Sequence, residues 1–189
     1  MDKLKCVPAV LTRDLQRLTI FDIGGQKVAA VPEGTKEIGK DCFCDTDISK
    51  VYVPKSVKII GRGAFRECKC LSEVIFAEDS QLKEICENAF HECVNLRSIS
   101  LPEGLEAVGI SSFKYSGLTE IAIPRTTRVI DCSAFSQCEN IHTVTFQEGS
   151  QLKKIGYNAF CGCKQLKNIS LPTGLEELGA SCFSDTGIA

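Results

Sequence analysis

The 189-residue sequence has no tryptophan, two histidines and one methionine, and only 7% of its residues are aromatic. Its 22 Lys and Arg against 24 Asp and Glu leave a formal net charge of −2. A chain this close to neutral lacks the electrostatic field that attracts nucleic acid or an anionic membrane, so neither is an expected partner. The length is that of one domain, or of one domain and part of a second.

Long hydrophobic runs are also missing. Pro8, Arg13 and Asp14 interrupt the apolar run that a secretory signal would need near the N-terminus. Elsewhere the charge-free stretches are far shorter than the roughly 18 apolar residues of a membrane helix. We therefore expect no membrane insertion and a cytoplasmic location, although a chain trimmed of its signal would look the same. In a reducing compartment cysteines are expected to be thiols unless they bind metal.

The sequence contains no motif of a common enzyme class: no G-x-G-x-x-G, no P-loop, no H-E-x-x-H and no G-x-S-x-G. Structural zinc sites pair cysteines two to four residues apart, and the chain has C-x-C pairs but no C-x-x-C. We expect no catalysis, no cofactor and no metal. Zinc binding, structural disulfides and a nucleophilic pair of His91 with Cys86 or Cys161 are the alternatives.

What the sequence does contain is a repeat. Seven of its ten phenylalanines are separated by 22, 25, 23, 22, 25 and 23 residues. They are Phe43, Phe65, Phe90, Phe113, Phe135, Phe160 and Phe183. The interval pattern itself recurs after 70 residues, and five of the six prolines follow the same step. The chain is therefore a repeat array, built from a triplet of repeats that was duplicated.

Aligned on these phenylalanines, the repeats share the pattern I-G-x-x-A-F-x-x-C-x-x-L-x-x-I-x-L-P, as in residues 155–172 and, with Cys86 in place of the glycine, in residues 85–102. Its L-x-x-I-x-L part (96–101 and 166–171) has apolar residues two apart, which is the spacing of a strand with one buried face. One strand cannot bury that face alone, but strands stacked repeat on repeat can. The sequence predicts an α/β repeat solenoid. Each repeat of 22–25 residues has one short parallel strand, with short turns, 3-10 or helical segments on the other side.

We expect the phenylalanines to stack as an internal ladder, and the glycines of I-G to serve a tight bend. Four cysteines follow a repeat phenylalanine by three residues, and two precede one where other repeats have alanine. These six are predicted to be small core residues: Cys68, Cys93, Cys138, Cys163, Cys42 and Cys182. The other six have no assigned role: Cys6, Cys44, Cys70, Cys86, Cys132 and Cys161.

This pattern resembles the BspA-type leucine-rich repeat family over roughly residues 31–189. The resemblance implies a right-handed leucine-rich repeat solenoid without catalysis, and functions in adhesion and other protein contacts. It also implies a cell-surface or secreted protein as the alternative location. The repeats centred on Phe43, Phe113 and Phe183 depart from the pattern, because they lose the cysteine and one residue: FCDTDI, FKYSGL and FSDTGI. The family cysteine is therefore replaceable.

The two ends of the chain differ from the rest. Residues 15–20 and 26–31 flank Gly24 and Gly25 and indicate a hairpin. We expect residues 1–30 to be an N-terminal cap and residues 31–189 to form the array of about seven repeats, the last one incomplete. No C-terminal cap is recognisable, which predicts either a fragment of a longer array or association of two copies through that end.

Binding is expected from the outward positions of the stacked strands. These residues form two rows on the sheet: Lys50, Glu73, Ser98, Glu120 and Thr143 in the first, and Tyr52, Ile75, Ser100 and Thr145 in the second. Tyr52 beside Ile75 is a plausible anchor for a protein ligand. The sequence thus predicts a non-enzymatic protein-binding scaffold of the adhesion type. The alternatives are a structural segment of a longer array, an intracellular adaptor, or strands whose surface has no ligand.

Overall fold

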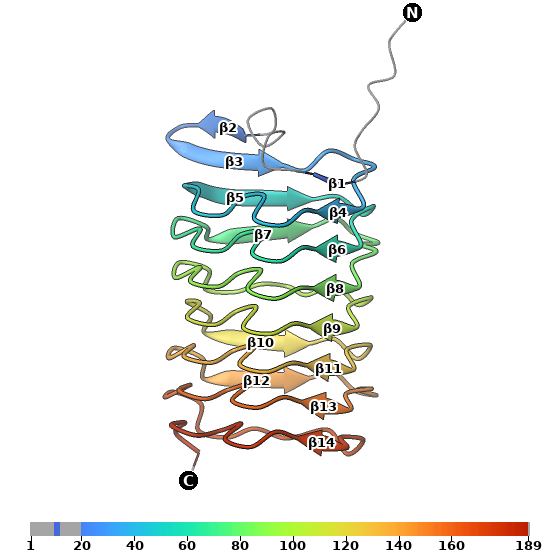
Figure 1. The fold of residues 1–189 in the computed structure, drawn as a ribbon, viewed down its shortest axis with the longest axis vertical. Helices are drawn as coiled ribbons and strands as arrows, with labels where there is room; N and C mark the ends of the chain where they lie inside the picture. Colours follow the sequence, from blue (N-terminus) through green and yellow to red (C-terminus); the bar gives the residue numbers. More distant parts are fainter. Residues whose placement is uncertain (1–9, 12–19, 189) are drawn as a thin grey trace, which may run out of the picture.

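A computed structural model describes residues 10–11 and 20–188, which stack as the coils of a solenoid (Figure 1). The strands of successive coils lie side by side in two columns, and all but one of the strand pairs are parallel. The predicted repeat solenoid with parallel strands is confirmed. The described residues contain no helix, so the parts of the coil outside the strands are turns and extended segments.

One column carries the predicted strands. It contains a four-stranded sheet in the order β2-β3-β5-β7 and a two-stranded sheet of β10 and β12. The strands are β2 (Ile20–Ile23), β3 (Gln26–Ala30), β5 (Ile48–Val53), β7 (Glu73–Phe76), β10 (Glu120–Ile123) and β12 (Thr143–Phe146). Along them buried residues alternate with residues that face outward, because successive side chains of a strand point to opposite faces.

The segments at 98–101 and 168–171 have the same sequence pattern, but neither joins this sheet as a strand. Among the described residues, the amides of Ser98 to Leu101 donate to no backbone carbonyl. Both segments follow a coil with the longer loop. A change of coil length between neighbours disturbs the alignment of N–H and C=O groups that a ladder needs. The prediction of one regular strand in every repeat is therefore wrong at these two places.

The second column is a sheet that the sequence pattern did not predict. Eight strands of two residues each pair in parallel in the order β1-β4-β6-β8-β9-β11-β13-β14. They are β1 (Val10–Leu11), β4 (Glu37–Ile38), β6 (Ile59–Ile60), β8 (Glu84–Ile85), β9 (Ala107–Val108), β11 (Val129–Ile130), β13 (Lys154–Ile155) and β14 (Glu177–Leu178). From β4 onward each ends at the apolar residue of the I-G motif, whose glycine is replaced by Cys86 after β8 and by Asp131 after β11. Every coil from β4 onward thus contributes a short strand here.

The glycines of the I-G motif serve this sheet, not a bend that requires positive φ. A Cβ at Gly61 would lie 2.7 Å from the Ile38 oxygen of the previous coil, and one at Gly109 would lie 2.7 Å from the Ile85 oxygen. A separation below 3 Å is not tolerated by backbone atoms. These glycines allow successive coils to approach one another closely.

The phenylalanine side of each coil forms a third ladder. The residues two before and two after each repeat phenylalanine have positive φ, between 51° and 77°. At each of the six steps between the coils of Phe43 and Phe183, three backbone N–H groups donate hydrogen bonds to carbonyls of the following coil. The donors are the phenylalanine and the two positive-φ residues beside it. Phe113, for example, donates to the Ala134 carbonyl at 2.8 Å. The turns are therefore as regularly hydrogen-bonded as the strands are.

The phenylalanine rings stack through the core as predicted. Neighbouring rings are almost parallel, with centroids 5.1–5.7 Å apart from Phe43 to Phe183. The first six rings are fully buried. Beside them, the four ladder cysteines donate from Sγ to the phenylalanine carbonyl of an earlier coil, at 2.9–3.2 Å: Cys68, Cys93, Cys138 and Cys163.

These cysteines are therefore hydrogen-bond donors as well as small apolar residues. In two of the repeats that lack the cysteine, a threonine supplies a similar bond, from Thr46 to the Phe43 carbonyl at 2.8 Å and from Thr186 to the Phe183 carbonyl at 2.7 Å. Cys42 and Cys182 are buried as predicted, and Cys44, which had no assigned role, is buried too.

The hairpin at the N-terminal end turns at Gly24 and Gly25, both with positive φ. Its first arm is β2, and its second arm, β3, pairs with β5 and so continues the sheet of the array. Residues 15–19 of the predicted first arm lie outside the described residues. The assignment of residues 1–30 to a cap stays a prediction.

Candidate protein-binding surface

The outward side chains of β3, β5, β7, the segment 98–101, β10 and β12 form one surface, which we call the sheet face. Lys50 pairs with Glu73 across β5 and β7, and Tyr52 pairs with Ile75. Between β10 and β12, Glu120 pairs with Thr143. The register therefore brings the predicted residues into two rows. Lys50 and Ile75 are half-buried and the other predicted residues are exposed.

The N-terminal half of the sheet face has a fixed aromatic side chain. Tyr52 is 44% exposed, and the Lys50 Nζ lies 5.0 Å from the centroid of its ring. The same Nζ lies 2.8 Å from a carboxylate oxygen of Glu73. The hydrogen bonds to Glu73 and then to Tyr52 raise the pKa of Lys50, so its ammonium is retained. The lysine thus holds the tyrosine ring in place by a cation–π contact.

The hairpin adds a residue to this half that sequence reasoning missed. Phe21 pairs with Val28, which pairs with Lys50 in the next strand. Ile20, its neighbour in β2, pairs with the fully buried Ala29, so Phe21 points outward and is 53% exposed. Ile20 and Phe21 are both apolar, so alternation in the sequence does not indicate which of the two faces outward, and the predicted first arm ends at residue 20.

The other half of the sheet face is hollowed on both sides of the segment 98–101. One hollow of ≈ 290 Å³ lies between this segment and β7 and is lined by Glu73 and Ile75. A second of ≈ 480 Å³ extends over β10 to β12. It brings together five of the predicted residues: Ser98, Ser100, Glu120, Thr143 and Thr145. Small side chains leave these hollows open.

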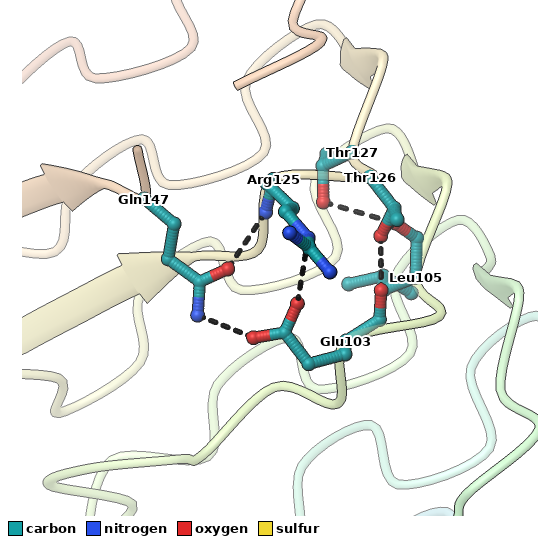
Figure 2. Close-up of polar contacts among 6 residues, drawn as sticks. All are labelled: Glu103, Leu105, Arg125, Thr126, Thr127 and Gln147. Carbon is teal, nitrogen blue, oxygen red and sulfur yellow. Dashed lines mark hydrogen bonds and ion pairs between the residues drawn. The ribbon is translucent and has the colours of Figure 1, made fainter. Parts of the chain in front are cut away.

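A polar network fixes one wall of the larger hollow (Figure 2). Gln147 donates from Nε2 to Glu103 at 2.6 Å and accepts the Arg125 backbone N–H at 2.8 Å. Arg125 Nε in turn lies 3.7 Å from a Glu103 carboxylate oxygen. Three successive coils are thereby linked at the corner after the strands. This network was not predicted either, because it joins residues 44 apart in sequence.

Several thiols lie where burial disfavours the reactive thiolate. Burial raises the pKa of Cys68 to about 11 and that of Cys138 to about 12. Burial, then the Glu84 carboxylate, raises the pKa of Cys86 to about 12. Burial also lowers the pKa of His91, which is half-buried. Reactive cysteines have the opposite shift. No cluster of three His, Cys, Asp or Glu within the described ranges could hold a metal ion.

Comparison with known proteins identifies the repeat. The family model described as "BspA type Leucine rich repeat region (6 copies)" matches residues 36–151 and 149–189. The chain belongs to the BspA-type leucine-rich repeat family. The resemblance inferred from the repeat pattern is thereby confirmed. No curated protein matches the chain.

Solved structures include other leucine-rich repeat proteins. The one from Bacteroides ovatus is 25% identical, with a TM-score of 0.63 over 100% of this chain and 51% of its own. The one from T. pallidum is 23% identical, with a TM-score of 0.59 over 74% of this chain and 77% of its own. This BspA-type chain thus spans about half the length of the Bacteroides protein.

Another match is described as a leucine rich cell surface protein from Faecalibacterium prausnitzii. It is 20% identical, and the match has a TM-score of 0.37 and covers 88% of this chain and 72% of that one. Within the BspA-type chain itself, the described residues include no helix that is long and apolar enough to span a membrane.

Proposed function

We propose that this BspA-type protein is a non-enzymatic scaffold that binds a protein partner through its sheet face. The observation that carries the proposal is the exposed Tyr52, which lies under the Lys50 ammonium and beside Ile75, a residue that lines the smaller hollow. Binding energy in protein interfaces is concentrated in a few anchors, of which tyrosine is a frequent one. The small hydroxyl side chains of the sheet face leave room for the surface of a partner to come close to the strands.

Family membership supports a binding role over an enzymatic one, and the raised thiol pKa values are in accord with it. We propose a cell-surface location in preference to the cytoplasmic one. A structural segment of a longer array, without a partner, is the second candidate, because the Bacteroides relative is about twice as long. Association of two copies through the last coil, where Leu171 and Leu178 are exposed, stays a prediction.

The double substitution Tyr52→Ala with Ile75→Glu is expected to weaken binding at least about 100-fold, since two anchors of roughly 2 kcal/mol or more are lost. Capture from a lysate with the wild-type chain as bait provides the partner, and its affinity for each variant is then measured by surface plasmon resonance. The melting temperature should change little, because both side chains lie outside the core.

The matched control is Tyr157→Ala with Ile110→Glu, which changes the same two residue types at exposed positions, 52% and 44% exposed, away from the sheet face. This variant should bind as the wild type does. Equal binding by both double variants would show that the sheet face is not the binding surface. Failure of the wild type to retain any partner would favour the structural segment.

A further inference from the structure

A notch interrupts the stack on the phenylalanine side, at the coil of Phe113. This coil has one residue fewer between its phenylalanine and the following core leucine than the coils on either side of it. A cavity of ≈ 400 Å³ results, between Val94 of the preceding coil and Glu139 of the following one. At its floor lies Gly117, where a Cβ would overlap the Val94 carbonyl oxygen. No side chain at position 117 can therefore fill the notch.

One wall of the notch is a tyrosine in a strained backbone conformation. Tyr115 has a φ of 59°, a left-handed conformation that bulky residues rarely adopt. The corresponding residues of the other six coils are smaller or unbranched polar ones: Asp45, Glu67, Glu92, Gln137, Gly162 and Asp185. The left-handed backbone belongs to every coil, and what distinguishes this coil is the bulky aromatic side chain placed there.

The tyrosine ring is exposed and yet held in position. It is 45% exposed, and His91 contacts it edge-on with centroids 5.8 Å apart and planes at 82°. The Lys114 Nζ lies 5.2 Å from its centroid. An aromatic side chain that is fixed before binding loses little conformational freedom when a ligand arrives.

The chemistry of the lining selects the ligand. Val94, which is 45% exposed, and Tyr115 provide apolar contact, whereas Glu92 and Glu139 provide two carboxylates. No lining residue is a cation, and beside the lining the His91 Nδ1 lies 3.6 Å from a Glu92 oxygen. Glu139 is engaged by the exposed Lys164 at 2.8 Å, but an exposed pair of this kind exchanges partners at little cost. The lining therefore matches a side chain with an apolar stem and a cationic head.

We propose that the notch binds an arginine side chain of a protein partner, at a site separate from the sheet face. The planar guanidinium packs on an aromatic ring and donates to more than one carboxylate, which a lysine ammonium does less well. Its stem would lie against Val94 and Tyr115, and its head between Glu92 and Glu139.

The probe for this site is a blocked pentapeptide with one arginine between glycines, followed by NMR of the tyrosine rings. The chain has only three tyrosines, and Tyr52 and Tyr157 are internal controls. We expect saturable shifts of the Tyr115 signals alone, with a Kd on the order of 1 mM for a single side chain. The same peptide with norleucine, which lacks the charge, should shift nothing. Equal shifts with norleucine or lysine peptides, or none with arginine, would overturn the proposal.

Two sets of variants separate binding from folding. The double substitution Glu92→Gln with Glu139→Gln should lower the affinity for the arginine peptide at least about tenfold, which is the effect expected when charge-assisted hydrogen bonds are lost. Tyr115→Gly, which relieves the backbone strain, should abolish the peptide's effect on the Gly117 amide signal without lowering the melting temperature. A clear fall in melting temperature, or peptide binding that persists, would show that the tyrosine is structural and overturn the assignment.

Discussion

Phe113→Ala is expected to lower the free energy of unfolding by about 3–5 kcal/mol, the range for phenylalanine truncation in a closed core. The Phe113 ring is fully buried and lies between two others, with centroids 5.1 Å from Phe90 and 5.3 Å from Phe135. Its removal leaves a cavity in the middle of the ladder, where neither neighbour can close the gap without moving its own coil. Urea denaturation followed by circular dichroism measures the effect, since the chain has no tryptophan for fluorescence.

Phe183→Ala is the matched control for that substitution. The Phe183 ring is only partly buried and has one stacking neighbour, Phe160, at 5.7 Å. The substitution at Phe183 should lower the free energy of unfolding by roughly half or less of the decrease expected at Phe113, because the Phe183 ring buries less apolar area on folding. Equal losses at the two positions would contradict a continuous internal stack.

Gly156→Ala is expected to destabilise the chain by about 3 kcal/mol, although alanine is only one methyl group larger. A Cβ at Gly156 would lie 2.5 Å from the Cys132 nitrogen and 2.7 Å from the Asp131 carbonyl carbon. Both are backbone atoms of the preceding coil, so the coils themselves would have to separate. The short strands β11 and β13 pair at this point, and their hydrogen bonds would lengthen.

Gly174→Ala controls for the change of residue type, since a Cβ at Gly174 would meet nothing within 4 Å. Alanine at this position should leave the free energy of unfolding unchanged or raise it by up to about 1 kcal/mol, because alanine lowers the conformational entropy of the unfolded chain. The two variants can be compared by thermal unfolding. Similar melting temperatures would mean that the close approach of the coils is not what the I-G glycines serve.

The solenoid coil and its core could be predicted from the sequence because the same core residues recur in every repeat. A phenylalanine at each interval must occupy the same place in every coil, and the cysteine three residues later lies beside it. The two-residue strands were not predictable, because alternation cannot be recognised over two positions. The left-handed positions beside the phenylalanines were hidden for another reason. Residues as different as Glu67 and Tyr115 occupy them, so they have no common residue type.

The sheet face was predictable only as two rows of residues. Alternation along a strand decides which side chains point outward, and the parallel register then aligns Tyr52 with Ile75. It does not show where a ladder fails, as it does at 98–101, or that hollows form beside that segment. Phe21 was missed because the predicted first arm of the hairpin ended at residue 20, whereas β2 continues to Ile23, and strand boundaries are hard to read from sequence.

Amide hydrogen exchange of the chain, alone and in complex with its captured partner, tests the sheet face most directly. Within residues 20–188 the amides of Ser98 to Leu101 have no backbone acceptor, so they should exchange rapidly in the free chain. We expect the partner to slow exchange there and in residues 48–53 and 73–76. Protection confined to the phenylalanine turns, with exchange at 98–101 unchanged, would contradict binding through the sheet face.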